Sequence, residues 1–398
     1  MSSEPFLFSS CWLKKMHFSH SILLLGVPLQ ATLLQEKKSL TRFYKQTKQA
    51  IIIKEKTKMQ TILKLILLLI LTLTSHAKTL QDREGNHIKV PQNIKKAFGS
   101  SPPMNYLLYA LNPKKMSGLN FKAKNNNNDA SEEFLSKEFL SLDVIGSFHG
   151  GGQSINLETI IKHRPDLILL WEDDLLVERV KSEIEKTRIS TITLPFRKIK
   201  DMPYAFSFAG EAIDEKERGD LLASYASKVI DEISESLKGA EPIKYYYAEG
   251  VDGLSTECHI SFHVEALNFA GGDNVHRCQQ GAVLGLERIS FETLLSYDPE
   301  IIIAQNELVY KNIFSNPIWK HLRAVKENRV FLVPNKPFNW IDRPPSFMRI
   351  IGIQWLAHIF HPELYNIDLN KRVKEFYSLY LNVEISERQI KQILGEKN

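Results

Sequence analysis

The chain has 398 residues, of which 43% are hydrophobic and 24% charged, with 19 glycines and 17 prolines. This composition excludes a collagen, a disulfide-knotted miniprotein and a wholly disordered chain, and the length allows about two domains. The formal charge of +5 is unevenly spread: residues 1–77 hold 11 basic and 3 acidic residues, so the remainder carries −3, which argues against nucleic acid as a partner.

The first recognisable segment is a secretory signal peptide at residues 59–77. It begins at Met59, continues through Lys64 and the apolar run Leu65–Leu73, and ends in Thr-Ser-His-Ala77. A charged start, an apolar centre and a small-x-small end are typical of such a peptide. The apolar stretch of about 12 residues is shorter than the ~20 that a membrane-spanning helix needs. We therefore expect cleavage after Ala77 and a periplasmic protein.

Residues 1–58 lie upstream of that signal and show no core pattern. They include a Lys-rich, acid-poor part between Lys37 and Lys58. Two explanations stay open: synthesis starts at Met59 and this stretch is a non-native upstream extension, or the chain has an unusual, disordered leader. No cysteine follows the predicted cleavage site, which disfavours a lipid-anchored form.

Two similar units, 134 residues apart, indicate an internal repeat. Each has a capping residue, a short helix with a glutamate (Glu158 or Glu292), a proline seven residues after that glutamate, and an apolar strand. Asn or Ser caps a helix, and proline prevents its continuation. The strands, 167–171 and 301–305, are uniformly apolar, as expected when helices cover both faces of a parallel sheet. The sequence therefore predicts two α/β halves.

The remaining elements fit the same α/β architecture. A helix is predicted between Asp214 and Leu237, where apolar residues recur every three or four positions, and it is long enough to join the two halves as a rigid rod. The other predicted strands are 95–100, 115–119, 190–194, 244–248 and 329–333. The predicted C-terminal helices are 347–360, 370–381 and 387–394 and close the second half.

After the predicted cleavage the chain keeps two cysteines, Cys258 and Cys278. In an oxidising compartment such a pair most simply forms a disulfide. A Cys/His metal site is the competing interpretation, since His259, His263 and His276 lie close by. We favour the disulfide, because zinc sites usually show more tightly paired ligands.

These features together resemble a known family. The two repeat units, the turn at Ala270–Asn274, the segment Trp319–Val333 and the central helix are similar to periplasmic solute-binding proteins that feed ABC importers of metal chelates. The resemblance covers roughly residues 79–385. It implies two Rossmann-like lobes joined by one long helix, with a ligand cleft between them: an N-terminal lobe at 78–203, a connecting region at 204–240 and a C-terminal lobe at 241–398.

The resemblance also implies partners and cargo. It predicts a monomer without catalytic activity or an intrinsic cofactor, which binds a metal chelate and docks on ABC permease subunits. Glu158 and Glu292 match the positions that pair with permease arginines in the family, although a glutamate there also offsets the helix dipole. An iron–siderophore complex or haem is favoured; a nickel or cobalt complex, a corrinoid and a metal oxyanion stay open. A secreted metal-dependent hydrolase or chelatase is the alternative of another class.

Candidate ligand residues follow the carboxyl ends of the predicted parallel strands, where open α/β sheets bind ligands. Trp171 offers a flat ring for a partly apolar chelate, and Arg277 and Arg343 offer guanidinium groups for its anionic oxygens. His149 offers an imidazole for an exposed metal position. The remaining candidates are Ser101, Glu249, His276 and Trp340. The sequence has no serine elbow, zinc-protease motif or phosphate loop, which argues against catalysis.

Overall fold

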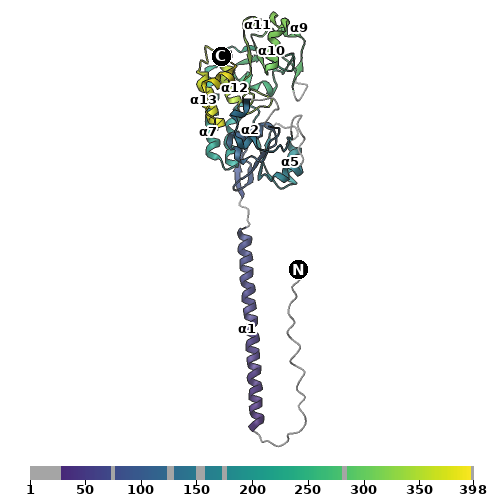
Figure 1. Cartoon of the computed structure of the whole chain (residues 1–398), viewed down its shortest axis with the longest axis vertical. Coiled ribbons are helices and arrows are strands. Elements are labelled where there is room, and N and C mark those ends of the chain that lie inside the picture. The colour runs from purple at the N-terminus through teal and green to yellow at the C-terminus, as the bar shows by residue number, and fades with distance from the viewer. Residues whose placement is uncertain are drawn as a thin grey trace. The chain divides into compact units, whose positions relative to one another are not determined.

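The computed structural model describes residues 28–72, 77–122, 130–148, 157–172, 177–279 and 285–395, which belong to two compact units, Met1–Thr74 and Ser75–Asn398. In the first unit, helix α1 (Pro28–Thr72) runs without a break through the predicted start of the signal peptide (Figure 1). Its large apolar side chains between Leu34 and Leu65 are exposed. Among the described residues, no helix combines the length and the apolar character that crossing a membrane requires.

The second unit begins with an antiparallel hairpin and continues into the first lobe. A parallel sheet of order β3-β4-β5 forms its centre, and the middle strand is buried along its whole length because helices cover the sheet. The strands are β1 (Ala77–Gln81), β2 (His87–Pro91), β3 (Ala97–Gly99), β4 (Leu167–Trp171) and β5 (Ser190–Leu194). The helices are α2 (Pro102–Leu111), η1 (Pro113–Lys115), η2 (Ala130–Phe134), α3 (Lys137–Leu140), α4 (Leu157–His163) and α5 (Val177–Glu185).

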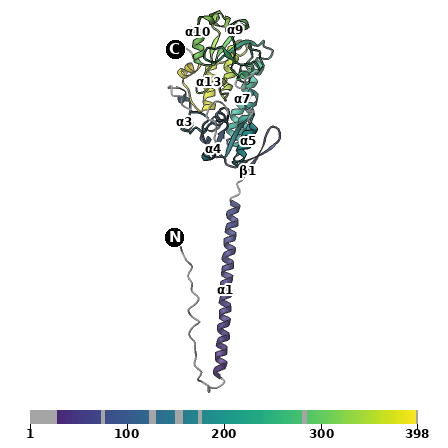
Figure 2. The same cartoon turned by 90° about the vertical axis from the view of Figure 1, so that its right-hand side faces the viewer.

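The second lobe contains a four-stranded parallel sheet of order β11-β10-β6-β8 and a small antiparallel pair, β7 with β9. Its strands are β6 (Ile243–Ala248), β7 (Ser255–Thr256), β8 (Gly272–Asn274), β9 (Glu287–Arg288), β10 (Ile301–Ala304) and β11 (Val330–Leu332). Its helices are η4 (Phe262–Val264), α8 (Glu265–Phe269), α9 (Phe291–Tyr297), α10 (Glu307–Ser315), η5 (Pro317–His321) and α11 (Arg323–Lys326). Figure 2 shows α4 and α5 at one end of the second unit and α9 and α10 at the other.

One long helix, α7 (Lys216–Ser236), connects the lobes as predicted, and a shorter helix, α6 (Met202–Ala212), packs against it. After η3 (Ile199–Asp201), α6 turns directly into α7, whose 21 residues span about 31 Å. The helices approach most closely at Gly210 and Gly219: a Cβ atom on Gly219 would lie 2.6 Å from the carbonyl oxygen of Phe206 and 2.9 Å from the Cα of Gly210. Only glycine therefore fits this crossing.

The C-terminal helices contact both lobes, although the sequence suggested that they would close only the second. Tyr377 lies 5.6 Å from Phe134 of η2 in the first lobe between ring centroids, and the Tyr380 hydroxyl donates to the carbonyl of Leu222 on α7. These helices are α12 (Arg349–Phe360), α13 (Leu369–Phe376), the π-helical turn η6 (Tyr377–Leu381) and α14 (Glu387–Leu394). One apolar core therefore runs from α2 through α7 to the C-terminus.

The predicted strand at 115–119 is wrong. In its place, Met116 and Leu119 make isolated parallel bridges to Ala97 and Val144. The 3-10 turn Pro113–Lys115 precedes them, and only single residues reach the edge of the sheet, so no continuous ladder forms.

The glycine crossing gives a test of the connection between the lobes. Gly219→Val should lower the free energy of unfolding by about 2 kcal/mol or more, because the new side chain must push α6 and α7 apart. Ser224→Val places the same residue on the exposed side of α7 and should cost only a few tenths of a kcal/mol. Urea unfolding followed by circular dichroism measures both, and equal losses in the two variants would contradict the close crossing.

Candidate functional site

The carboxyl end of the first sheet contacts the second lobe through aromatic side chains. Trp171, the last residue of β4, packs edge-to-face on Phe262 of η4, with ring centroids 5.8 Å apart. The guanidinium carbon of Arg197, which follows β5, lies 4.7 Å from the centroid of the same Phe262 ring. A tryptophan, a phenylalanine and a cation from both lobes therefore meet at one place.

A buried polar bridge fixes that junction. Arg349 at the start of α12 is 1% exposed, and its guanidinium donates to the carbonyl of Arg197 (2.7 Å) and to the carboxylate of Glu265 (2.5 Å). Glu265 in turn accepts from the backbone N–H of Ile199 at 3.0 Å. Burial raises the pKa of Glu265. Two side chains of the second lobe thus hold the backbone that leaves β5 of the first lobe.

The carboxyl end of the second sheet carries a buried charge cluster. Arg343 donates through Nε to Glu249, which follows β6, and through Nη2 to Glu257. A carboxylate oxygen of Asp342 lies 2.5 Å from Nδ1 of His263, within hydrogen-bond distance. The three carboxylates are at most 1% exposed, so their charges must be compensated inside the protein.

Glu249 and Glu257 share the single guanidinium of Arg343. Among the described residues, Oε2 of Glu249 is buried without a hydrogen-bond partner. Burial raises the pKa of Glu249 to about 8, the ion pair with Arg343 opposes this shift, and the neighbouring carboxylates add to it. Glu249 is therefore largely neutral at pH 7.

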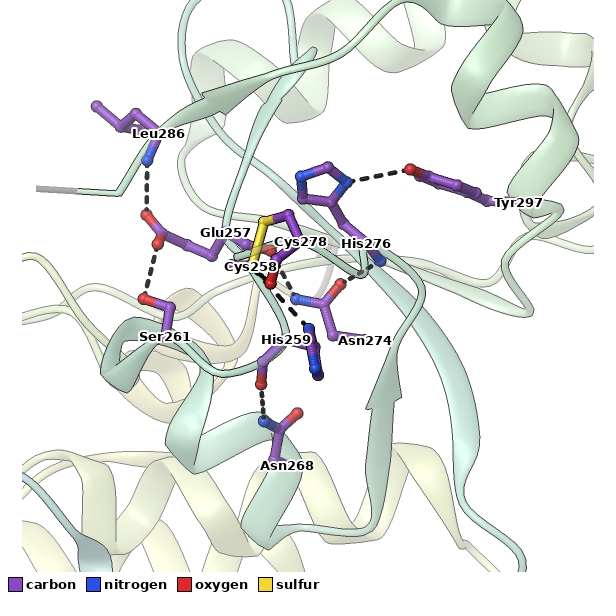
Figure 3. Close-up of a disulfide and its surroundings, with 10 residues drawn as sticks. All are labelled: Glu257, Cys258, His259, Ser261, Asn268, Asn274, His276, Cys278, Leu286 and Tyr297. Carbon is purple, nitrogen blue, oxygen red and sulfur yellow. Dashed lines mark hydrogen bonds between the residues drawn. A yellow bond between two sulfur atoms is a disulfide. The ribbon is translucent and has the colours of Figure 1, made fainter. Parts of the chain in front are cut away.

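Glu257, which the sequence analysis missed, connects four segments of the second lobe (Figure 3). Its carboxylate accepts from the backbone N–H of Leu286 (3.0 Å) and the hydroxyl of Ser261 (2.8 Å), in addition to Arg343. Its backbone carbonyl accepts from the Asn274 amide at 2.9 Å. Gly285 adopts a left-handed φ of +68°, and a Cβ there would lie 2.1 Å from the Glu257 carboxylate oxygens. The turn before β9 therefore closes directly over this carboxylate.

The disulfide Cys258–Cys278 fixes the residue next to Glu257 (Figure 3). Nδ1 of His259 lies 3.9 Å from Sγ of Cys258, and the backbone N–H of His259 donates to the carbonyl of His276. Nδ1 of His276 lies 3.1 Å from the Tyr297 hydroxyl, and burial lowers the pKa of His276. Across the described part of the chain, no group of three or more His, Cys, Asp or Glu side chains is arranged to hold a metal ion.

Polar side chains also lie at the carboxyl end of β3 in the first lobe. Ser101 begins α2 but its hydroxyl does not cap the helix. Among the residues that the structure describes, the hydroxyls of Ser100 and Ser101 and the Oδ1 of Asn120 are buried without a hydrogen-bond partner. The Asn120 amide nitrogen donates to the carbonyls of Gly99 and Gly146, which fixes its orientation and leaves Oδ1 as an acceptor. These groups can bind hydroxyl or oxyanion oxygens.

The structure places two other predicted ligand residues, Arg277 and Trp340, apart from this junction. Arg277 is exposed and pairs with Asp273 on its own segment. Trp340 is fully buried in the main apolar core, where its backbone carbonyl abuts Gly352 of α12. His149 lies outside the described residues. Of the predicted set, Trp171 ends β4, Glu249 follows β6, and Ser101 and His276 each lie two residues beyond a strand. Arg343 reaches this edge through its ion pair with Glu249.

Glu158 and Glu292 occupy equivalent positions in the two lobes. Each is the second residue of a short helix, α4 or α9, and each helix precedes an interior strand of its sheet, β4 or β10. Both are exposed. The repeat seen in the sequence therefore corresponds to a repeated helix–strand unit with its acidic residue at the same place.

The raised pKa of Glu249 predicts a pH-dependent stability. The folded state retains the proton between the ordinary carboxyl pKa and about 8, so wild-type stability should fall as the pH rises through that window. Glu249→Gln mimics the neutral form. The unfolding free energy of Glu249→Gln minus that of wild type should rise by about 2 kcal/mol or more from pH 5 to pH 9.

Urea unfolding at pH 5, 7 and 9 measures this difference. Glu241→Gln, at an exposed position, is the matched control and should follow the wild-type curve. Parallel pH curves for Glu249→Gln and wild type would show that Glu249 is ionised in the folded protein.

Comparisons with known proteins agree with this geometry. Residues 126–337 match the periplasmic binding protein family. An ABC transporter solute-binding protein structure from Sulfurospirillum deleyianum is 38% identical, with a TM-score of 0.75 over 80% of this chain and 99% of that one. The molybdate-binding protein MolA of Haemophilus influenzae is 22% identical over 58% of this chain and 71% of its own length. The vitamin B12-binding protein of Vibrio parahaemolyticus is 20% identical over 52% of this chain and 72% of its own length.

Family membership decides between the alternatives of the sequence analysis. The protein from Sulfurospirillum deleyianum is a solute-binding protein of an ABC transporter and the two curated relatives are binding proteins, which excludes the alternative of a secreted hydrolase or chelatase. The two lobes and the long connecting helix are those of the family's structures. The chain belongs to the periplasmic binding protein family and is a solute-binding component of an ABC transporter, not an enzyme.

Proposed function

We propose that this protein captures an anionic metal chelate between its lobes and delivers it to an ABC permease, with an iron–siderophore complex or haem as the favoured cargo. The observation that carries the proposal is the junction of Trp171, Phe262 and Arg197. Aromatic faces suit a large, partly apolar organic ligand, and guanidinium groups suit its anionic oxygens. Two similar proteins bind molybdate and vitamin B12, so metal-containing cargo occurs among similar proteins.

The proposed binding residues come from both sheets. Trp171, Arg197 and Ser101 line the side of the first lobe, and Glu249, His276 and Arg343 line the side of the second. His149 stays a prediction as a metal ligand. We leave Arg277 and Trp340 out, because the first is engaged in a surface ion pair and the second is enclosed in the core. A nickel or cobalt complex, a corrinoid and a metal oxyanion are the alternative cargoes.

A thermal-shift screen tests the cargo class. The probes are a ferric catecholate siderophore, haemin, a nickel–histidine complex, cyanocobalamin and molybdate. A ligand at 100 times its Kd stabilises the folded protein by ~2.7 kcal/mol, so the correct class should raise the Tm by several degrees. We expect the siderophore or haemin to do so, and native mass spectrometry should show one ligand per chain.

Substitutions test whether the bound probe contacts the junction of Trp171, Phe262 and Arg197. Trp171→Ala and Arg197→Gln should each weaken binding of the stabilising probe by about tenfold or more, whereas Arg277→Gln, the matched arginine control, should not. If only molybdate or cyanocobalamin binds, the anionic organic chelate is wrong and the family function stands. Binding that Arg277→Gln weakens as much as Arg197→Gln would also contradict the proposed site.

We further propose that Glu158 and Glu292 pair with basic residues of two permease subunits. Their equivalent, exposed positions on α4 and α9 support a symmetrical docking surface. Reversing both charges (Glu158→Lys/Glu292→Lys) should abolish uptake of the bound cargo in cells while leaving its Kd unchanged. Glu138→Lys/Glu363→Lys makes the same charge change at other exposed sites and should retain uptake. Normal uptake with the first pair would rule out this docking mode.

For localisation, we propose that residues 59–77 are the export signal and that the exported protein is a monomer. Two features support the signal. The boundary between the compact units falls after Thr74, and the first strand of the second unit begins at Ala77. Cleavage after Ala77 would remove one residue of β1 and leave its pairing with β2 from Lys78 onward.

A further inference from the structure

A second region of the molecule combines a hollow with unpaired positive charge. It lies between α7, α13 and η6 and has a volume of about 690 Å³. It is distinct from the junction of the two sheets, since none of the residues proposed to bind the chelate lines it. Four cationic side chains border it: Arg218, Lys228, Lys371 and Lys374.

Arg218, which lines this hollow, connects three segments of the protein. It lies on the first turn of α7, and its guanidinium donates to the backbone carbonyls of Ala110 on α2 (3.1 Å) and Leu379 in η6. Within the described ranges, no carboxylate lies at ion-pair distance from it. Burial lowers the pKa of Arg218, and the more distant charge of Glu215 only partly opposes this shift. Neutral carbonyls accept the hydrogen bonds of a partly buried guanidinium, but they do not compensate its positive charge. An anion placed in the hollow would supply the compensating charge.

Three lysines add further positive charge to that of Arg218. In the part of the chain that the structure describes, Lys228, Lys371 and Lys374 make no ion pair, although neighbouring lysines such as Lys216 do. Two carboxylates, Glu375 and Glu384, also border the hollow, and Glu384 accepts from the Ser378 hydroxyl at 2.6 Å. The lining therefore keeps two positive charges beyond its acidic groups, since four cations face two carboxylates.

We propose that this hollow is an anion site for a phosphate-bearing ligand, separate from the chelate cleft and independent of the proposed cargo. Guanidinium and ammonium groups are the usual partners of phosphate oxygens, and the hollow is large enough for a diphosphate or a phospholipid headgroup. Arg218 contacts α2 of the first lobe and η6 of the C-terminal segment, so an anion bound there stiffens the connection beside α7.

Calorimetric titration of the exported protein with inorganic pyrophosphate, without chelate, tests the site. We expect saturable binding of one pyrophosphate per chain that weakens as salt screens the charges. Lys371→Glu/Lys374→Glu should weaken it on the order of tenfold or more. Arg218→Lys keeps the charge but loses the planar fork and should weaken it less. Lys89→Glu/Lys95→Glu, the same charge change at exposed positions elsewhere, should leave it unchanged.

Vesicle sedimentation distinguishes a free phosphate from a headgroup. Preferential binding to phosphatidylglycerol over phosphatidylcholine vesicles, lost in Lys371→Glu/Lys374→Glu and retained in the control pair, would identify an anionic headgroup as the ligand. No binding of pyrophosphate or anionic vesicles at low salt would overturn the proposal. So would an equal loss in the control pair. Because both probes are used without chelate, neither result depends on whether the cargo assignment is correct.

Discussion

The buried guanidinium of Arg349 fastens the two lobes to each other, and the geometry of the candidate site depends on it. It is held between Glu265 and the carbonyl of Arg197, and Glu265 also binds the backbone of Ile199. Removing one partner of such a buried pair typically costs ~3–5 kcal/mol, because a charge is left without compensation. This bridge keeps Arg197 and Trp171 of the first sheet against Phe262 of the second lobe.

In the second lobe, buried carboxylates lie at the carboxyl end of the sheet. Glu257 and the disulfide beside it hold Arg343 among three buried carboxylates, and burial raises the pKa of Glu249, one of these carboxylates. In this cluster, some buried polar atoms have no hydrogen-bond partner within the described part of the chain. A ligand that supplies these hydrogen bonds would be bound favourably, because a buried polar atom without a partner is costly. The two edges thus offer a cargo different chemistry: aromatic rings with a cation on one side, and a titratable acidic cluster around Arg343 on the other.

Local patterns in the sequence predicted much of the fold. The strands 167–171 and 190–194 coincide with β4 and β5, and the helix predicted between 214 and 237 is α7, because continuous apolar runs and a 3.6-residue period are direct signatures of these elements. Helix α6 was missed because its eleven residues, Met202–Ala212, are nearly all apolar or small and show no polar face. The site was harder to predict. Trp171 and Arg343 follow strands or adjoin turns, but Glu257, Phe262 and Glu265 acquire their roles only from partners tens of residues away, which spacing along the chain does not reveal.

A crystal structure of the protein with the chelate that stabilises it would test the central claim most directly. The account predicts one ligand between the carboxyl ends of the two parallel sheets, in contact with Trp171 or Arg197 from the first lobe and with Arg343 or Glu249 from the second. A ligand held by one lobe alone, or seated in the hollow beside α13, would contradict it.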